Sequence, residues 1–157
     1  MAQPIPMRPF TDSLPMALLR ARESTMQHFR TLLAKSELTE QQWRVLRALA
    51  SRQEAYEVTE LAERTALLAP SISRIVANLD DRGLIVRTTV AHDQRRAQLQ
   101  LTRSGRALVR RLAPESEAIY NSIEEHFGAD RLADLMAELK DLAETVSHKI
   151  TVEGEVS

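Results

Sequence analysis

Apolar residues recur with the period of an α-helix along most of this chain. At 100° per residue, the apolar side chains of residues 14–34 fall on one broad face, which predicts a first amphipathic helix. The positions on this face are Leu14, Leu18, Ala21, Thr25, Met26, Phe29, Leu32 and Leu33. Arg22 falls inside the same face, where a charged side chain is unexpected.

Three shorter helices are predicted next. Thr39 with Gln42 three residues later forms a capping box, which satisfies two backbone N–H groups at a helix start. A short helix over about 59–65 and a tight turn follow. The next helix begins near Pro70, whose missing N–H has no cost at the first helical position. It ends at Gly83, a residue that accepts positive φ.

The apolar period then changes from 3.6 to 2. Alternating apolar residues over 84–90 and again over 97–101 predict two antiparallel strands. The residues between them, His92-Asp93-Gln94-Arg95-Arg96, are polar and basic. The pattern therefore predicts a β-hairpin with a basic tip, directly after the helix-turn-helix.

Two long helices complete the predicted fold. Thr102 caps the first, which extends to Phe127 and contains Pro114, so we expect a kink or break near Ala113. Gly128 separates it from the last helix. The last helix carries an apolar stripe formed by Leu132, Leu135, Met136, Leu139, Leu142 and Val146.

The expected fold class is mainly α with a small β-hairpin wing, a winged helix-turn-helix flanked by dimerisation helices at both ends. A small winged domain cannot cover the long apolar stripes of the flanking helices, which favours a dimer. The expected divisions are a flexible arm over 1–13, a single domain over 14–150, dimerisation helices over 14–38 and 103–150, the winged helix-turn-helix over 39–102, and a frayed tail over 151–157.

Composition excludes several classes of protein. Cysteine is absent, which excludes a disulfide framework and a thiolate metal site. The histidines are His28, His92, His126 and His148, and they lack metal-binding spacing. We find no nucleophile–base pair and no glycine-rich phosphate loop, so we expect neither an enzyme nor a cofactor. No apolar run is long enough to cross a membrane and no signal peptide is recognisable, which indicates a soluble cytoplasmic protein.

The charge is distributed unevenly along the chain. Residues 1–63 hold eight basic and eight acidic side chains, whereas residues 64–111 hold ten arginines against three aspartates. Residues 112–157 hold three basic and eleven acidic side chains. The basic middle segment indicates a surface that binds a polyanion, with an ordinary solvated basic face as the alternative.

A winged helix-turn-helix places the N-terminal residues of its second helix in the major groove of DNA. Here those residues are Ser71, Ser73 and Arg74, with Asn78 one turn later. Serine and arginine donate hydrogen bonds to bases or phosphates, and the helix N-terminus favours a nearby phosphate. The serines alone are typical of any helix start. Their combination with Arg74 and the hairpin favours a DNA-facing surface.

The hairpin tip supplies three further candidates for DNA binding, Asp93, Arg95 and Arg96. Asp93 is placed to hold Arg95 by a charge-assisted hydrogen bond across the turn, which would preorganise a guanidinium at the end of the wing. Narrow A·T-rich minor grooves attract such a charge. The alternative is an exposed turn with ordinary solubilising charges.

The sequence from about residue 14 to residue 150 resembles the MarR family of bacterial transcription regulators. The motifs that carry the resemblance are Leu61-Ala62-Glu63-Arg64, Ser71-Ile72-Ser73-Arg74-Ile75-Val76, Arg82-Gly83-Leu84-Ile85, Asp93-Gln94-Arg95-Arg96 and Leu101-Thr102-Arg103-Ser104-Gly105. Within the family, the segments 43–49 and 68–71 resemble the branch that represses homoprotocatechuate (4-hydroxyphenylacetate) degradation operons.

The resemblance implies a homodimer, joined through the first helix and the last two, that binds a pseudopalindromic operator. It also implies a repressor of an aromatic-acid catabolic operon. A small aromatic carboxylate, bound between the dimer helices and the DNA-binding lobe, would release it from DNA. The alternative is a winged helix that binds protein and no operator, against which Arg74 and the basic wing argue.

Four residues are candidates for binding this effector: Arg22, Trp43, Arg47 and His28. A buried guanidinium at Arg22 needs a partner, and its planar fork suits a carboxylate. The alternative partner is a protein carboxylate, or helix C-terminal carbonyls, across the dimer interface. Trp43 starts the apolar stripe of the adjacent helix and is placed to stack on an aromatic ring. Arg47, one turn later, and His28, on the flank of the first helix, are further candidates.

Overall fold

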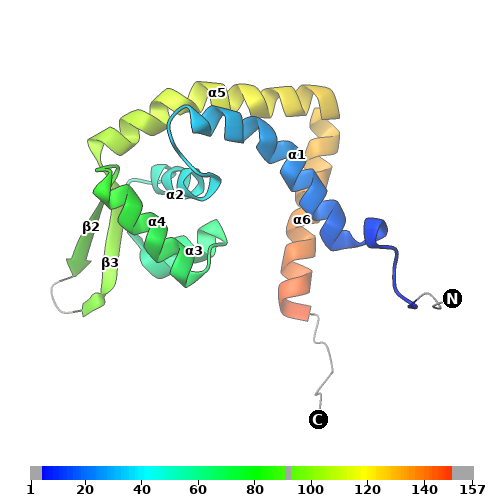
Figure 1. The fold of residues 1–157 in the computed structure, drawn as a ribbon, viewed down its shortest axis with the longest axis horizontal. Helices are drawn as coiled ribbons and strands as arrows, with labels where there is room; N and C mark the ends of the chain where they lie inside the picture. Colours follow the sequence, from blue (N-terminus) through cyan, green and yellow to red (C-terminus); the bar gives the residue numbers. More distant parts are fainter. Residues whose placement is uncertain (1–4, 91–92, 150–157) are drawn as a thin grey trace, which may run out of the picture. The chain divides into compact units, whose positions relative to one another are not determined.

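The computed structural model describes residues 5–90 and 93–149 of the 157-residue chain. Its elements are η1 (Phe10–Asp12), α1 (Leu14–Ala34), α2 (Glu40–Ala50), β1 (Tyr56–Glu57), α3 (Val58–Thr65), α4 (Ala69–Asp81), β2 (Ile85–Val90), β3 (Asp93–Leu101), α5 (Arg103–Phe127) and α6 (Ala129–Lys149) (Figure 1). They divide into two compact units, Met1–Ser116 and Glu117–Ser157, and α5 extends through both. The predicted single domain over 14–150 stays a prediction.

Local capping residues set the ends of several helices. The capping box of α2 is present, because the Thr39 hydroxyl accepts the Gln42 N–H at 3.1 Å and the Gln42 side-chain oxygen accepts the Thr39 N–H at 2.9 Å. α4 begins at Ala69, one residue earlier than predicted, so Pro70 is its second residue. Gly83 adopts φ +67° directly after this helix, as predicted for a left-handed residue at a helix end.

The wing is a three-stranded antiparallel sheet in the order β1-β3-β2. β2 and β3 form the predicted hairpin, in which Ile85 lies opposite Leu101. β1 pairs Tyr56 with Leu99 on the other edge of β3. Sequence analysis did not predict β1, because two residues are too few to show the alternation that identifies a strand.

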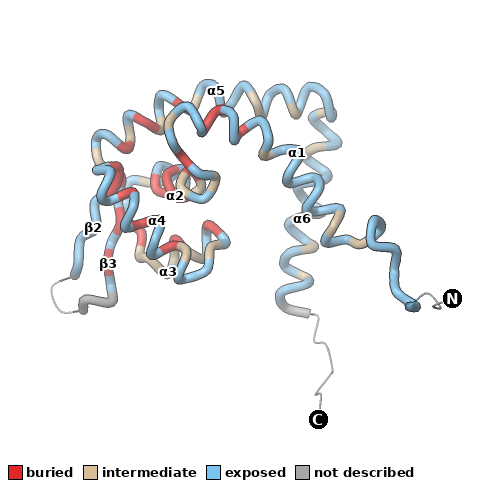
Figure 2. The backbone as a smooth tube through the Cα atoms, in the orientation of Figure 1, coloured by how far each residue is buried: buried red, intermediate tan, exposed pale blue. Residues whose placement is uncertain are grey.

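The core of unit 1 lies between the helices of the helix-turn-helix, the sheet and the first half of α5 (Figure 2). Its fully buried side chains include Leu33, Val45, Leu46, Tyr56, Leu61, Ile72, Leu79, Ile85 and Leu99. The Tyr56 hydroxyl lies 3.2 Å from the Ser51 hydroxyl, and the Arg52 guanidinium stacks on the Tyr56 ring. The core thus holds α4 at a defined position against the sheet.

The start of α5 packs tightly against the residue that precedes β2. The Thr102 hydroxyl accepts the Gly105 N–H at 3.0 Å, as a helix cap does. A Cβ atom at Gly105 would lie 2.0 Å from the Leu84 carbonyl oxygen, so only glycine fits there.

Of the kink or break predicted near Ala113, the break is wrong, and the kink stays a prediction. α5 continues through Pro114, which sits inside the helix. Leu112 and Ser116, on either side of the proline, are buried.

Unit 2 has apolar side chains but no core of its own among its described residues. None of residues 117–147 is buried. The exposed apolar side chains are Tyr120, Phe127, Leu135, Met136 and Val146. No helix of the described residues is long and apolar enough to cross a membrane. The predicted frayed tail over 151–157, and residues 1–4 of the predicted arm, lie outside the described residues.

Candidate nucleic-acid interface

α4 presents two chemically different faces. Ile72, Val76 and Leu79 are buried in the core of unit 1. Ser73, Arg74 and Asn78 are exposed on other sides of the helix, and Ser71 is half-buried. Within the described residues, Arg74 forms no ion pair. The helix therefore offers hydroxyl, guanidinium and amide groups to a partner outside unit 1.

A hollow of about 300 Å³ lies between the N-terminal part of α2 and this helix. Its lining residues are Thr39, Gln41, Gln42, Ser71, Arg74, Ile75 and Asn78. The structure thus brings together three of the four predicted α4 candidates, while Ser73 lies outside the hollow. The Gln42 side-chain NH₂ donates to the Asn78 Oδ1 at 2.7 Å. Sequence analysis placed Gln42 in a helix cap and did not predict this contact with α4.

Arg96, the last of the three arginine candidates, lies on β3 toward the hairpin tip and forms an ion pair. The Arg96 guanidinium donates to the Glu57 carboxylate at 2.8 Å, and the Arg96 side chain is 63% exposed. Arg96 therefore starts partly neutralised. Asp93 and Arg95 belong to β3, but their side chains lie outside the described part of the chain. The predicted bond between them stays a prediction.

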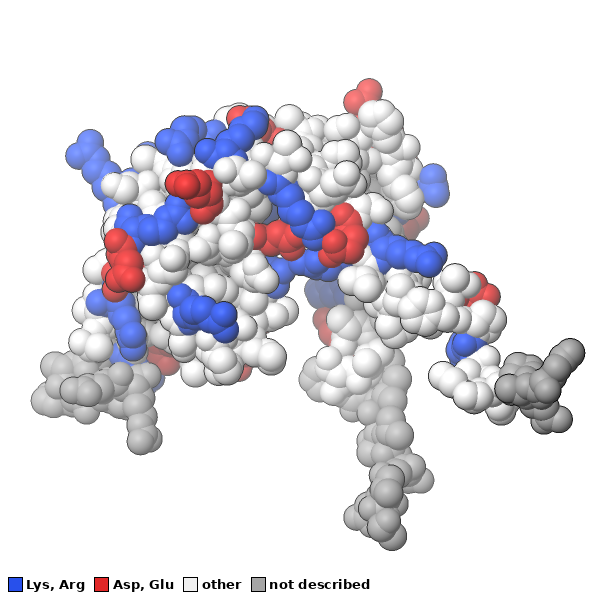
Figure 3. Space-filling model, in the orientation of Figure 1, with Lys and Arg blue, Asp and Glu red and all other residues white. Residues whose placement is uncertain are grey.

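Basic side chains on unit 1 do not form one continuous patch. Figure 3 shows blue side chains over the region of α4 and the hairpin, interspersed with red side chains and uncharged surface. Red and blue side chains meet where α1 approaches α2. The excess positive charge of residues 64–111 is thus distributed over several separate sites on the surface. A long polyanion such as duplex DNA can contact several such sites at once.

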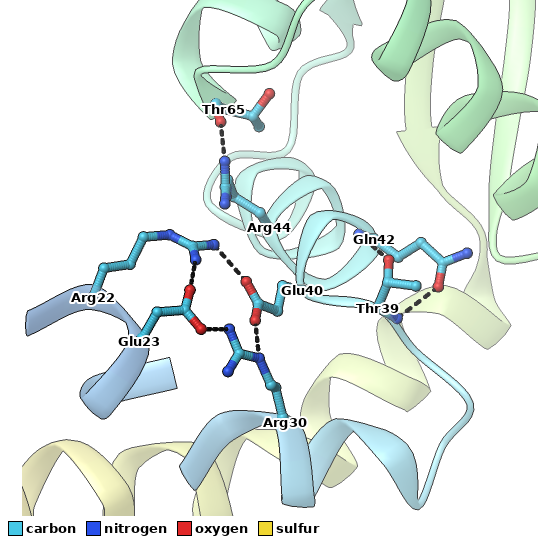
Figure 4. A network of polar contacts seen from close by, with 8 residues as sticks. All are labelled: Arg22, Glu23, Arg30, Thr39, Glu40, Gln42, Arg44 and Thr65. Carbon is cyan, nitrogen blue, oxygen red and sulfur yellow. Dashed lines mark hydrogen bonds and ion pairs between the residues drawn. The ribbon is translucent and has the colours of Figure 1, made fainter. Parts of the chain in front are cut away.

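Within unit 1, Arg22 lies in a network of charged side chains, and its predicted burial against a partner copy or an effector stays a prediction. Its side chain is 43% exposed and forms ion pairs with Glu23 at 2.7 Å and Glu40 at 2.5 Å (Figure 4). Arg30 joins the same network, with its Nη2 2.6 Å from Glu23 and its Nε on Glu40. Only Phe29, Leu32 and Leu33 of α1 are buried within unit 1, and the apolar side chains of Leu14, Leu18 and Leu19 toward its N-terminus are exposed. The carboxylates that pair with Arg22 belong to the same chain.

Glu40, which sequence analysis missed, is the centre of this network. Its side chain is only 13% exposed. Burial opposes ionisation of the Glu40 carboxyl, but hydrogen bonds from Arg30 and Arg22 outweigh burial and hold its pKa below the ordinary value. The same contacts raise the pKa of Arg30, chiefly through its hydrogen bonds to Glu23 and Glu40. Four charged groups thus tie α1 to the first turn of α2.

The other effector candidates lie on α1 and α2. Glu40, Trp43 and Arg47 are three and four residues apart, so they follow one face of α2. Trp43 is 5% exposed, and its indole N–H is buried without a hydrogen-bond partner among the described residues. Arg47 is exposed on α2, and His28 is exposed on α1.

A second hollow, of about 440 Å³, is lined by Arg22, Arg30, Leu33, Leu38, Thr39, Glu40 and Gln41. Of the four predicted effector residues, only Arg22 borders it. Glu40 and Arg30 border it as well, so its charged groups already pair with one another. An anion that binds in this hollow has to compete with the Glu40 carboxylate for Arg22 and Arg30.

Comparisons with known proteins agree with this architecture. A family model described as the MarR family matches residues 36–96. The homoprotocatechuate degradative operon repressor of Escherichia coli is 39% identical over 124 residues, which cover 79% of this chain and 83% of that protein. It is named as a repressor and not as an enzyme, which confirms the expectation of a regulator.

Two solved structures share the fold. NadR in complex with 4-hydroxyphenylacetate has a TM-score of 0.73 and 34% identity, covering 93% of this chain and 100% of its own. CouR, a transcriptional repressor bound to a 23-mer DNA duplex, has a TM-score of 0.77 and 29% identity, covering 90% and 99%. These matches confirm the predicted winged helix-turn-helix fold. The chain belongs to the MarR family of transcription regulators.

Proposed function

We propose that this protein is an operator-binding repressor of an aromatic-acid catabolic operon, released from DNA by a small aromatic carboxylate. The observation that carries DNA binding is the polar surface of α4. Ser73, Arg74 and Asn78 are exposed there while the apolar face of the helix is buried. A helix anchored in this way can enter the major groove without loss of its own packing. CouR, which has the same fold, is bound to duplex DNA.

We assign the operator contacts as follows. Ser71, Ser73, Arg74 and Asn78 lie against the major groove, and the wing with Asp93, Arg95 and Arg96 lies against the adjacent backbone and minor groove. To bind a phosphate, the Arg96 guanidinium has to break its ion pair with Glu57 or donate to the phosphate and to Glu57 at the same time. DNA binding of this kind takes place in the cytoplasm of a bacterial cell.

We assign a homodimer from the apolar side chains that unit 1 and unit 2 leave uncovered. On α1, Leu14 is 52% exposed and Leu18, four residues later, is 39% exposed, and on α6, Met136 is 61% exposed. Exposed leucine and methionine at helical spacing are typical of a surface that a second copy covers. A two-fold dimer then presents two copies of α4 to a pseudopalindromic operator.

The effector proposal rests on Trp43 of α2 and on two arginines, Arg22 of α1 and Arg47 of α2. The buried indole N–H without a partner is costly, and an oxygen atom of a ligand would satisfy it. The Arg22–Glu23 ion pair is exposed on both sides, at 43% and 46%, so its net stability is small. An effector carboxylate is able to replace Glu23 on Arg22, and Arg47 and His28 are further candidates. NadR, at 34% identity, binds 4-hydroxyphenylacetate.

Two measurements on the purified full-length chain test this function. Selection of duplexes from a randomised library, followed by anisotropy titration, tests for a sequence-specific operator. Trp43 is the single tryptophan of the chain, so its intrinsic fluorescence reports ligand binding directly. We expect a palindromic consensus, and quenching by 4-hydroxyphenylacetate together with release of DNA. Absence of any enriched sequence would instead favour a winged helix that binds protein.

A further inference from the structure

We infer that Gln42 is a positioning residue that fixes which end of the Asn78 side-chain amide faces the DNA. It thereby determines which base Asn78 prefers. This inference rests on the operator binding proposed above. It goes beyond that proposal, because it assigns a role in recognition to a residue of α2 that does not itself have to touch the DNA.

The orientation of the Gln42 side-chain amide is set at the helix cap. The Thr39 backbone N–H is a donor only, so the Gln42 atom that faces it at 2.9 Å has to be the carbonyl oxygen. The NH₂ group of Gln42 therefore points the other way. It meets Asn78 at 2.7 Å, and the Asn78 atom that receives this bond has to be the Oδ1 acceptor.

The orientation of the Asn78 amide follows from this chain of bonds. With its Oδ1 turned toward Gln42, the Asn78 Nδ2 group is turned away from Gln42, and Asn78 is exposed on α4. Asn78 thus presents a hydrogen-bond donor. In the major groove this donor matches acceptors, which are guanine O6 and N7, adenine N7 and thymine O4. The N4 amino group of cytosine is itself a donor and is a mismatch.

Without Gln42, the amide of an exposed asparagine is free to turn over and offer either end. The bond from Gln42 removes this freedom before DNA arrives, because Gln42 is itself held by Thr39 in both directions of the capping box. A fixed donor discriminates between bases more sharply than a freely rotating amide does. The cap of α2 and the base preference of α4 are therefore linked.

The direct test is the variant Gln42→Glu. A carboxylate at this position still accepts the Thr39 N–H, as in the usual capping box, so the helix start is preserved. Its second oxygen is an acceptor where the amide had a donor. We expect the Asn78 amide to reverse and to present its oxygen to the DNA. The preferred base at that one position should change toward cytosine, whose N4 amino group is a donor, and affinity for the wild-type sequence should fall about tenfold.

Gln41→Glu is the matched control, because it adds the same charge to the same helical turn and lines the same hollow. It should weaken binding to all sequences alike without changing the consensus. A second control repeats Gln42→Glu in an Asn78→Ala background. There the change of preference should disappear, since no amide remains to be reversed.

The measurement is library selection with each variant, with thermal unfolding followed in parallel. If the wild type enriches no sequence, the proposed function fails, and this inference fails with it. If the wild type enriches a sequence and Gln42→Glu retains the same consensus, only the inference is overturned. A uniform loss of affinity across all sequences also overturns it, since that places Asn78 on a phosphate. Should Gln42→Glu not fold, Gln42→Ala removes the donor to Asn78 and keeps the Thr39 hydroxyl cap. It should broaden the base preference at the same position, and an unchanged preference would overturn the inference.

Discussion

The Arg96 guanidinium and the Glu57 carboxylate form an ion pair with a separation of 2.8 Å within the wing. Glu57 belongs to β1, which pairs with β3, the strand that carries Arg96. Both side chains are more than one third exposed, so the pair adds little to stability. Its larger effect is on charge, because a carboxylate next to Arg96 reduces the attraction between the wing and a phosphate.

Removing this carboxylate should strengthen DNA binding. We expect Glu57→Gln to increase operator affinity by about 0.5–1 kcal/mol, and to make the dependence of affinity on salt steeper. Asp80→Asn, on the exposed end of α4, is the control for the loss of one negative charge elsewhere on the lobe. Anisotropy titrations at fixed salt would measure both variants. An equal gain in the two variants would show that the pairing with Arg96 has no special effect.

The glycine at the start of α5 gives a prediction about stability. Gly105→Ala places a Cβ atom 2.0 Å from the Leu84 carbonyl oxygen, so the helix has to move away from the residue that precedes β2. We expect a loss of about 1–3 kcal/mol in the free energy of unfolding, in the range of overpacked cores. Ser104→Ala, on an exposed position of the same turn, should change it by less than about 0.5 kcal/mol. Urea unfolding at one protein concentration provides both values.

The network around Glu40 gives a prediction about pH. The pKa of the folded Glu40 carboxyl lies below its unfolded value, so Glu40 adds stability above the unfolded pKa and loses it as the pH falls through the folded pKa. We therefore expect Glu40→Gln to be less stable than the wild type at neutral pH, by about 1 kcal/mol. The two unfolding curves should converge as the pH falls below about 4. A constant difference down to the most acidic pH would contradict an ionised, paired Glu40.

The exposed ion pair of α1 gives a prediction about the effector. If an effector carboxylate replaces Glu23 on Arg22, then Glu23→Gln removes the competitor and should raise effector affinity about two- to fivefold. Arg22→Ala should lower effector affinity, yet leave a folded dimer that binds operator. Trp43 fluorescence titration with 4-hydroxyphenylacetate measures both. Normal effector affinity in Arg22→Ala would rule out Arg22 as the residue that binds the effector carboxylate and leave Arg47 as the candidate. A monomeric or unfolded variant would show that Arg22 has a structural role.

The parts of this structure that sequence analysis predicted are those with local causes. The start of α2 depends on Thr39 and Gln42, three residues apart, and the end of α4 depends on Gly83. The groups exposed on α4 follow from its helical period, since Ile72 and Val76 mark the buried side. Such signals lie within one or two helical turns, where a single sequence is informative.

The parts that it missed depend on contacts between distant residues. Arg22 meets Glu40 across 18 positions, Gln42 meets Asn78 across 36, and Arg96 meets Glu57 across 39. No spacing or period indicates these pairs, because each depends on how two elements pack. The apolar stripe of α1 likewise extends beyond the part that unit 1 buries, so the burial predicted for Arg22 is not tested within one chain and stays a prediction.

The central claim is that the polar surface of α4 binds duplex DNA. The most direct test is the equilibrium affinity of the wild type and of Arg74→Ala for the duplex selected by the wild type, measured over a series of salt concentrations. We predict steep weakening of wild-type binding with salt, from release of counterions, and a loss of about 1–3 kcal/mol on removal of Arg74. Salt-independent binding, or equal affinity of the two proteins for the selected duplex, would contradict the account.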